Sequence, residues 1–266
     1  MMNRPVISLT TDFGTGDYDA GVLNGVILSI APEARISVLT HDITPFNILE
    51  GAVILSRCTP YFPEYSIHVA VVDPGVGTSR RGLAARLGRQ IFVGPDNGLC
   101  TLMVEAARKE DLPVEYYALE NEIYWLPNVT HIFHGRDIFA PVAAHIAAGV
   151  PLNALGSPVV DPVLLNMPVP TRLENGWHGT LLHVDHFGNL TSNLTAGHLE
   201  GRSNFSLQIQ GTTINNLTTT YGVAQPGSLI CLLDDSGSLE IAVSQGSAAD
   251  RLKAGVGTEF DLVFQE

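Results

Sequence analysis

The sequence predicts an α/β protein: an N-terminal α/β layer domain with a mainly parallel sheet, followed by a smaller C-terminal all-β barrel domain. In the first half, short apolar runs alternate with segments of helical spacing, as in sheets whose strands are joined by helices. In the last third, strand-like runs dominate, which is typical of a small barrel. The 266 residues are 45 % hydrophobic and 15 % charged, which supplies ample core.

The first domain, residues 1–165, is expected to alternate strands and helices. An apolar run at 6–11 ends at Asp12, and a nearly continuous one at 67–72 ends at Asp73, as in strands covered on both faces. Spacing of apolar residues predicts helices, and Asn47 and Asp137 are candidate N-caps. The elements expected between and after these two strands are a helix at 18–30, a strand at 36–39, a helix from Asn47 toward Cys58, a hairpin at 83–93 that turns near Gly88, a helix at 99–107 and a helix from Asp137.

Residues 166–176, rich in proline and polar side chains, are predicted to be a linker. The second domain is then 177–266. Its expected elements are strands at 180–184, 205–209, 228–233, 239–243 and 260–264 and a short helix at 248–252.

The net charge of −13 argues against nucleic acid as a partner, because an acidic surface repels phosphates. Cys58, Cys100 and Cys231 are widely spaced and odd in number, which favours reduced thiols over a disulfide framework. No apolar run has the length of a membrane span, and residues 1–5 do not begin a signal peptide. We therefore expect a cytoplasmic protein with no membrane partner.

Two carboxylates follow strands of the first domain. Asp12 and Asp73 end their apolar runs, and ligands of open α/β sheets gather at the carboxyl ends of strands. Gly14 and Gly16 after the first strand permit close approach of chain and ligand. The alternative is that each Asp only caps the next element.

Arg80, Arg81 and His134 are the further polar candidates. The glycine-rich segment DPGVGTSRR at 73–81 returns two guanidinium groups toward Asp73, where an arginine can hold an anion or orient water. His134 is expected on the loop before a helix, where an imidazole can act in proton transfer. The alternatives are a surface salt bridge and a structural histidine.

In the second domain, DHFGN at 185–189 stands between two strands. Phe187 is suited to stack on a flat ring, and Asn189 to hydrogen-bond the edge of that ring. Without other support, a hairpin turn explains the same residues.

Six segments in order resemble the S-adenosylmethionine (SAM) hydroxide adenosyltransferase family, the adenosine-forming SAM hydrolases, which are relatives of fluorinase and chlorinase. Any one of them is weak, whereas the ordered set covers nearly the whole chain. They are TTDFG at 10–14, ITPFNILEGA at 43–52, VVDPGVGTSRR at 71–81, GPDNGL at 94–99, FHGRDIFAP at 133–141 and DHFGN at 185–189.

The resemblance implies hydrolysis of SAM to adenosine and L-methionine, by attack of an activated water or hydroxide on the ribose C5′. It implies no cofactor and no metal, and a homotrimer with each site between the N-terminal domain of one subunit and the C-terminal domain of its neighbour. By motif match, Asp73, Arg80 and His134 are the catalytic trio; Arg80 is preferred to Arg81 because the family's arginine lies seven residues beyond the aspartate.

The resemblance also implies a set of substrate-binding positions. Asp12 matches the carboxylate that takes the ribose hydroxyls, and Asp185 lies near the methionine amino group. At 234–237 the sequence reads DDSG where the family often has Asn-Ser before a glycine, which weakens the match at Asp235. The remaining positions are Phe46 near the ribose, Phe187 and Asn189 on the adenine side, and two further substrate-binding positions, Phe133 and Val243.

Hydroxide is favoured over halide as the nucleophile. The resemblance places tyrosine at the positions of both Asp73 and His134 in the fluorinase branch, which also carries an extra loop for which the 83–93 hairpin leaves no room. A carboxylate at position 73 would also repel a halide ion.

Two other functions remain open from the residues. Asp12, Asp17 and Asp19 loosely resemble a carboxylate cage for a hard cation, as in a metal-dependent nucleoside hydrolase. A non-catalytic protein that binds adenosine or SAM would share most of the same contacts. A purely structural interpretation explains each motif singly, but not their joint order.

Overall fold

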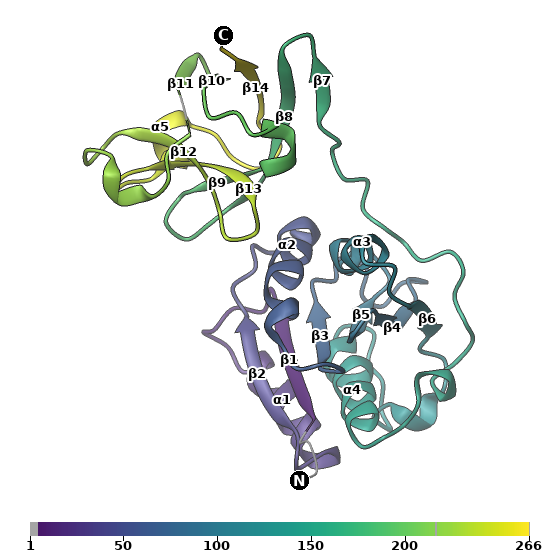
Figure 1. The fold of residues 1–266 in the computed structure, drawn as a ribbon. Coiled ribbons are helices and arrows are strands. Elements are labelled where there is room, and N and C mark those ends of the chain that lie inside the picture. The colour runs from purple at the N-terminus through teal and green to yellow at the C-terminus, as the bar shows by residue number, and fades with distance from the viewer. Residues whose placement is uncertain (1–4, 216, 266) are drawn as a thin grey trace. The chain divides into compact units, whose positions relative to one another are not determined.

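The computed structural model describes residues 5–215 and 217–265, which divide into two compact units between Leu165 and Asn166 (Figure 1). Each unit has a sheet and a hydrophobic core of its own. Along the described chain, no helix combines the length and the apolar composition that crossing a membrane requires.

The first unit contains a six-stranded sheet in the order β2-β1-β3-β5-β4-β6. Strand β1 pairs in parallel with β2 and β3, and β3 with β5, whereas β4 runs antiparallel to both β5 and β6. Every strand except β4 therefore points the same way, which confirms the predicted mainly parallel sheet. The strands are β1 (Val6–Thr11), β2 (Arg35–Thr40), β3 (Ile67–Val71), β4 (Gly82–Leu87), β5 (Gln90–Pro95) and β6 (Val114–Ala118).

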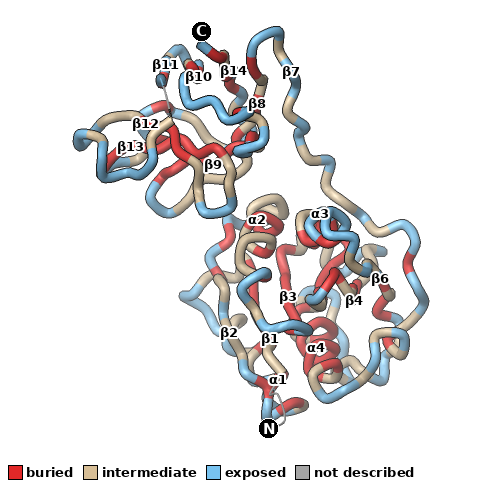
Figure 2. The backbone as a smooth tube through the Cα atoms, viewed as in Figure 1, coloured by how far each residue is buried: buried red, intermediate tan, exposed pale blue. Residues whose placement is uncertain are grey.

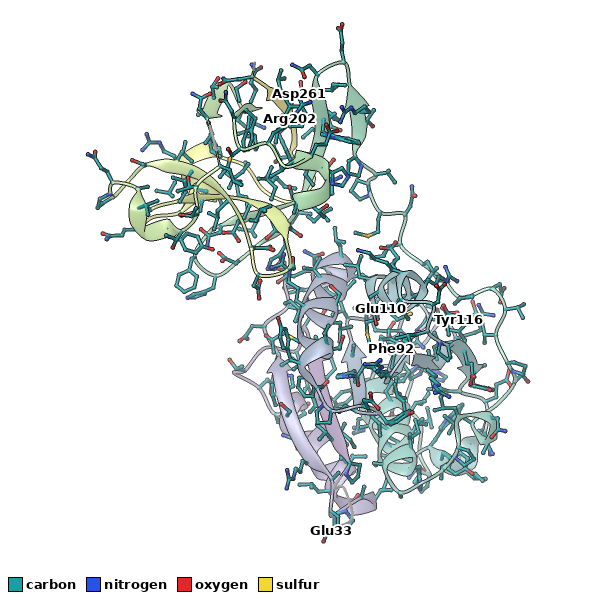
Figure 3. All side chains as sticks on the ribbon, viewed as in Figure 1. Glu33, Phe92, Glu110, Tyr116, Arg202 and Asp261 are labelled. Carbon is teal, nitrogen blue, oxygen red and sulfur yellow. The ribbon has the colours of Figure 1, made fainter. Side chains whose placement is uncertain are left out.

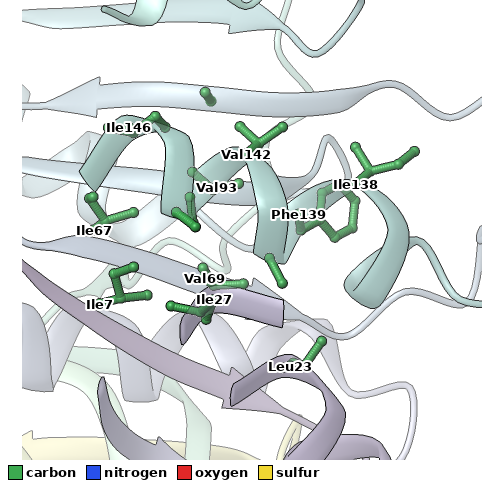
Figure 4. Packing of buried hydrophobic residues seen from close by; sticks show 14 of the residues in the cluster. Ile7, Leu23, Ile27, Ile67, Val69, Val93, Ile138, Phe139, Val142 and Ile146 are labelled. Carbon is green, nitrogen blue, oxygen red and sulfur yellow. The ribbon is translucent and has the colours of Figure 1, made fainter. Parts of the chain in front are cut away.

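Helices cover both faces of this sheet. One core cluster joins α1 and α4 to the strands through residues such as Leu23, Ile27 and Val142 (Figure 4). A second lies under α2 and α3 and contains Phe92 and Tyr116, which Figure 3 labels. The helices are α1 (Asp19–Ile30), α2 (Ile48–Cys58), α3 (Thr101–Lys109) and α4 (Ala140–Ala147), with short turns η1 (Thr59–Tyr61), η2 (Glu122–Tyr124) and η4 (Leu152–Ala154) and a π-helix η3 (Gly135–Phe139).

The burial pattern explains why the strands read as apolar runs. All five residues of β3 are buried, and β1 is buried from Ile7 onward (Figure 2). A strand covered on both faces has no polar side to alternate with its apolar one. The predicted hairpin is also confirmed, since β4 and β5 turn at Gly88, which has φ 61°.

The prediction that Asp137 caps a helix is wrong. Asp137 lies inside η3, and the N-cap of α4 is Phe139, which makes no side-chain cap. The fully buried Asp137 carboxylate instead accepts hydrogen bonds from N–H and Oγ1 of Thr130, both at 2.7 Å, and pairs with Arg136. A buried charge needs such partners, and here they tie down the loop that leads to His134.

The second unit is a barrel-like antiparallel sheet in the order β11-β10-β14-β8-β9-β13-β12, with β7 paired to β8. A bridge between Leu217 and Cys231 brings the β11 and β12 ends together, so the sheet nearly closes on its core. This confirms the predicted β-barrel class. The strands are β7 (Thr171–Leu173), β8 (Gly176–Val184), β9 (Leu190–Thr195), β10 (Phe205–Ile209), β11 (Thr212–Asn215), β12 (Leu229–Leu233), β13 (Ser238–Val243) and β14 (Glu259–Phe264), with α5 (Ala248–Leu252), η5 (Ala196–Leu199) and η6 (Tyr221–Val223).

Candidate active site

Asp12 and Asp73 lie at one edge of the first sheet. Asp12 directly follows β1, Asp73 lies two residues beyond β3, and the two strands are parallel neighbours. Both residues line a cavity of about 240 Å³, together with Phe46, Phe133 and His134. Five positions predicted from the sequence therefore surround one pocket in the first unit.

Arg80 joins Asp73 to His134. Its Nε and Nη2 donate to the two carboxylate oxygens of Asp73 at 3.1 and 2.5 Å, and Nη2 also lies 3.0 Å from Nδ1 of His134. The Arg80 and Asp73 side chains are only 10 % and 5 % exposed. A bidentate pair of this kind fixes both groups in distance and orientation, so the structure brings the predicted trio together.

The contact with Arg80 determines the hydrogen position on His134. A guanidinium has donors and no acceptor, so Nδ1 of His134 must accept. The neutral imidazole then carries its hydrogen on Nε2. Partial burial and the positive charge of Arg80 both lower the pKa of His134, which favours this neutral form.

Asp73 is shifted in the other direction. Burial raises the pKa of its carboxyl, opposed by the charge and hydrogen bonds of Arg80. A carboxylate has about four lone-pair sites, of which Arg80 takes two and the backbone N–H of Gly75 a third, so one remains for a further donor. The cluster therefore offers a proton acceptor at Asp73 and a hydrogen-bond donor at Nε2 of His134.

Asp12 holds the loop before α2. Its Oδ2 accepts the backbone N–H of Phe46 at 2.9 Å, whereas the N-cap of α1 is Tyr18. The alternative that Asp12 caps the next helix is therefore wrong. Phe46 has φ 68°, a strained conformation for a residue with a side chain, and the residue is 70 % exposed.

Arg81 does not join the cluster. It pairs with Asp96 and with Asp161, which is 75 % exposed, and so fits the salt-bridge alternative. The geometry thus separates two adjacent arginines that the sequence distinguished only by spacing.

Asp185, Phe187, Asn189 and Val243 line a second cavity, of about 500 Å³, in the second unit. Asp185 organises the turn between β8 and β9: Oδ1 accepts the N–H groups of Phe187 and Asn189 at 2.9 and 2.8 Å, and Oδ2 accepts Nδ2 of Asn189 at 2.9 Å. Phe187 is left 74 % exposed. The predicted hairpin turn is confirmed, and its side chains face a pocket.

Two features of this second pocket differ from the expected set. Asp235 lies on the exposed turn between β12 and β13 and is not among the residues that line the cavity. Tyr221, which sequence reasoning missed, lines it and donates to Oε1 of Glu240 at 2.7 Å. It stands in an irregular polar stretch, so no periodicity pointed to it.

The carboxylates proposed for a metal cage are not brought together. Within 5–215 and 217–265, no group of three or more His, Cys, Asp or Glu side chains converges as it would around an ion. Asp17 instead accepts the N–H of Tyr18, and Asp19 begins α1.

The chain is therefore a two-domain protein in which an α/β unit carries an Asp–Arg–His cluster at its strand ends and a barrel-like unit follows in sequence. Models of the SAM hydroxide adenosyltransferase N-terminal and C-terminal domains match residues 7–156 and 179–261. The chain belongs to the SAM hydroxide adenosyltransferase family.

Relatives and solved structures agree with this. The chain is 38 % identical to the (R)-S-adenosyl-L-methionine hydrolase of Salinispora arenicola, over 97 % of this chain and 98 % of that one. It is 29 % identical to a fluorinase of an Actinoplanes species, over 74 % of each chain. A crystal structure of an uncharacterised conserved protein from Thermotoga maritima superposes with a TM-score of 0.89 at 33 % identity, covering 97 % of this chain and 99 % of that one.

Proposed function

We propose that this chain hydrolyses S-adenosyl-L-methionine to adenosine and L-methionine. The observation that carries the proposal is the Asp73–Arg80–His134 cluster, built into a pocket that Asp12 and Phe46 also line. The sulfonium of SAM makes methionine a good leaving group, so the reaction needs an aligned and activated water rather than an electrophilic catalyst. The similarity to the (R)-S-adenosyl-L-methionine hydrolase named above supports the substrate.

The tautomer of His134 assigns the roles. Nε2–H donates to the oxygen of the attacking water, Asp73 accepts its proton, and Arg80 holds both groups in place. The water oxygen bonds to C5′ as the C5′–S bond breaks, and the electron pair of that bond neutralises the sulfonium. In this assignment the proton goes to Asp73 and not to His134. Positioned proton transfer of this kind contributes about 10²–10⁴-fold.

The substrate-binding roles follow the family match, and those of Phe133 and Val243 follow from the pockets that these two residues line. Asp12 takes the ribose hydroxyls, with Phe46 and Phe133 beside the sugar, and Asp185 takes the methionine amino group. Phe187, Asn189 and Val243 hold the adenine side, with backbone rather than side-chain contact near Asp235. The reaction needs no cofactor. We place it in the cytoplasm, a reducing compartment, because the three cysteines are free thiols.

The test is incubation of the purified chain with SAM, followed by chromatography. Adenosine and methionine are expected in equal amounts, in excess chloride and in EDTA alike. Mainly 5′-chloro-5′-deoxyadenosine would contradict hydroxide as the nucleophile, and loss of activity in EDTA would contradict a metal-free reaction. Tight binding of SAM without turnover would favour the binding-protein alternative, and release of ribose from inosine the nucleoside hydrolase.

The dependence of turnover on pH tests the proton roles. Turnover is expected to be constant at neutral and alkaline pH and to fall on acidification below 6.5, the ordinary imidazole pKa. The lowered pKa of His134 and the raised pKa of Asp73 both place the titrations on the acid side. Protonation there removes the acceptor at Asp73 and sets a second cation against Arg80. A kcat that climbs through alkaline pH, after subtraction of an enzyme-free blank, would contradict these roles.

The proposal includes a homotrimer in which the Asp73 pocket of one copy and the Asp185 pocket of its neighbour form one site. Asp73→Asn and Asp185→Asn should each be nearly inactive alone. After refolding of an equal mixture of the two variants, about one quarter of all sites should regain activity, because each trimer of mixed composition has one site in about three at which the two intact pockets meet. Recovery after co-refolding measures it, and no recovery in trimers of mixed composition would contradict a site shared between copies.

A further inference from the structure

The segment 96–98, between β5 and α3, belongs to one of the six family motifs and has no role in the mechanism above. It follows β5, which is the parallel neighbour of β3, so it lies at the same edge of the sheet as Asp73. Its two polar side chains make hydrogen bonds beside the catalytic cluster: Asn97 binds the backbone of Val72, and Asp96 accepts from the Arg81 side chain.

Asn97 holds the peptide that precedes Asp73. Its Nδ2 donates to the carbonyl oxygen of Val72 at 2.8 Å. Strand β3 pairs with β1 only as far as Val71 and with β5 only as far as Val69, so Val72 lies past both ladders. The Oδ1 of Asn97 accepts the N–H of Leu99 at 3.3 Å, which fixes which end of the amide faces Val72.

Asp96 fixes the backbone next to Arg80, the residue that pairs with Asp73. Its carboxylate, only 1 % exposed, binds Arg81, and its N–H donates to the Arg81 carbonyl oxygen at 2.9 Å. Nη1 of Arg80 donates to that same oxygen at 3.0 Å. One short segment thus fixes a backbone carbonyl on each side of the Asp73–Arg80 pair.

We infer that Asn97 is a positioning residue for the hydrolytic reaction: by fixing the Val72 carbonyl, it sets the direction in which the Asp73 carboxylate leaves the sheet. The inference rests on the proposed function. Asn97 does not line the pocket, and Asp12 and Phe46 do not depend on it. Its loss should therefore change the chemical step and leave substrate affinity nearly intact.

The test compares Asn97→Ala with the wild-type enzyme. We expect kcat to fall about ten- to hundredfold, because displacements near 1 Å cost about 10²-fold in aligned reactions, with KM for SAM within about threefold. Asn97→Asp keeps the size but sets an acceptor against the Val72 carbonyl; it should also lower kcat and shift the acid limb of the pH profile upward, since a carboxylate near Asp73 raises its pKa. In the Asp73→Asn background, Asn97→Ala should add less than about twofold.

Asn121 provides a matched control. Its Nδ2 donates to the Ala154 carbonyl oxygen at 2.9 Å and its Oδ1 accepts the N–H of Ile123 at 3.4 Å, the same pair of bonds in the same unit but away from the pocket. Asn121→Ala should lower Tm by a few degrees, as Asn97→Ala does, but should leave kcat unchanged. Wild-type kcat in folded Asn97→Ala or Asn97→Asp, or a full additional loss in the Asp73→Asn background, would overturn the inference. If the wild-type enzyme itself leaves SAM intact, the proposed function fails instead.

Discussion

Replacement of Asp73 by asparagine is expected to lower turnover of SAM by about 10²–10⁴-fold, the usual contribution of a positioned proton acceptor. Asparagine keeps the shape of the side chain and one hydrogen bond from Arg80, so the pocket should stay formed. What is lost is the buried negative charge, and with it the acceptor for the proton of the attacking water. Rapid-quench turnover and calorimetric binding of SAM measure the two quantities separately.

Asp161→Asn is the control for this change. Asp161 is also an arginine-paired aspartate, but it is exposed and lies outside the pocket. Exposed ion pairs contribute about 0–1 kcal/mol, so turnover and stability should hardly move. Equal turnover in Asp73→Asn and Asp161→Asn would remove Asp73 from the mechanism. Weaker SAM binding, with kcat unchanged, would make Asp73 a substrate contact instead.

The pattern of buried strands was enough to predict where the two carboxylates of the candidate site, Asp12 and Asp73, lie. A run of apolar residues followed by aspartate specifies both a covered strand and a polar group at its end, and parallel pairing of β1 and β3 then brings Asp12 and Asp73 to one edge. The partly polar strand β9, LTSNLT, and the short strand β11, TTIN, were missed. Their few apolar residues, Leu190 and Leu194 in β9 and Ile214 in β11, are buried in the core but are too sparse to form a strand-like run, and pairing with neighbouring strands completes both elements.

The hydrogen bonds of the two pockets could not be predicted from the sequence, because they depend on contacts between residues that lie far apart in the chain. Asp137 looks like a helix cap, and only the position of Thr130 shows that it anchors a loop. The hydrogen on His134 follows from Arg80, which lies 54 positions earlier in the chain. Tyr221 lines the pocket of the second unit and donates a hydrogen bond to Glu240, a contact that no local sequence pattern predicts.

Gly77, in the segment that follows Asp73, lies against the loop before His134 that Asp137 anchors. It adopts φ +76°, and a Cβ built on it would overlap the carbonyl oxygen of His131, three residues before His134. The loop cannot simply retreat, because the Asp137 carboxylate holds Thr130 at its other end. An added methyl group must therefore displace either the 73–79 turn or the loop that carries His134.

Gly77→Ala is accordingly expected to damage stability and catalysis together. Left-handed backbone costs a residue with a side chain about 1–2 kcal/mol, and forced overlap in a packed region about 1–3 kcal/mol more. Gly14→Ala carries only the cost of the left-handed backbone, because Gly14 also has φ +76° in the same unit but meets nothing within 4 Å. The difference between the two variants therefore measures the cost of the overlap. Urea unfolding should show the larger loss for Gly77→Ala, and its turnover should fall about 10²-fold if His134 moves by about 1 Å. Equal losses of stability in the two variants, with full turnover in Gly77→Ala, would mean that the two loops do not constrain each other.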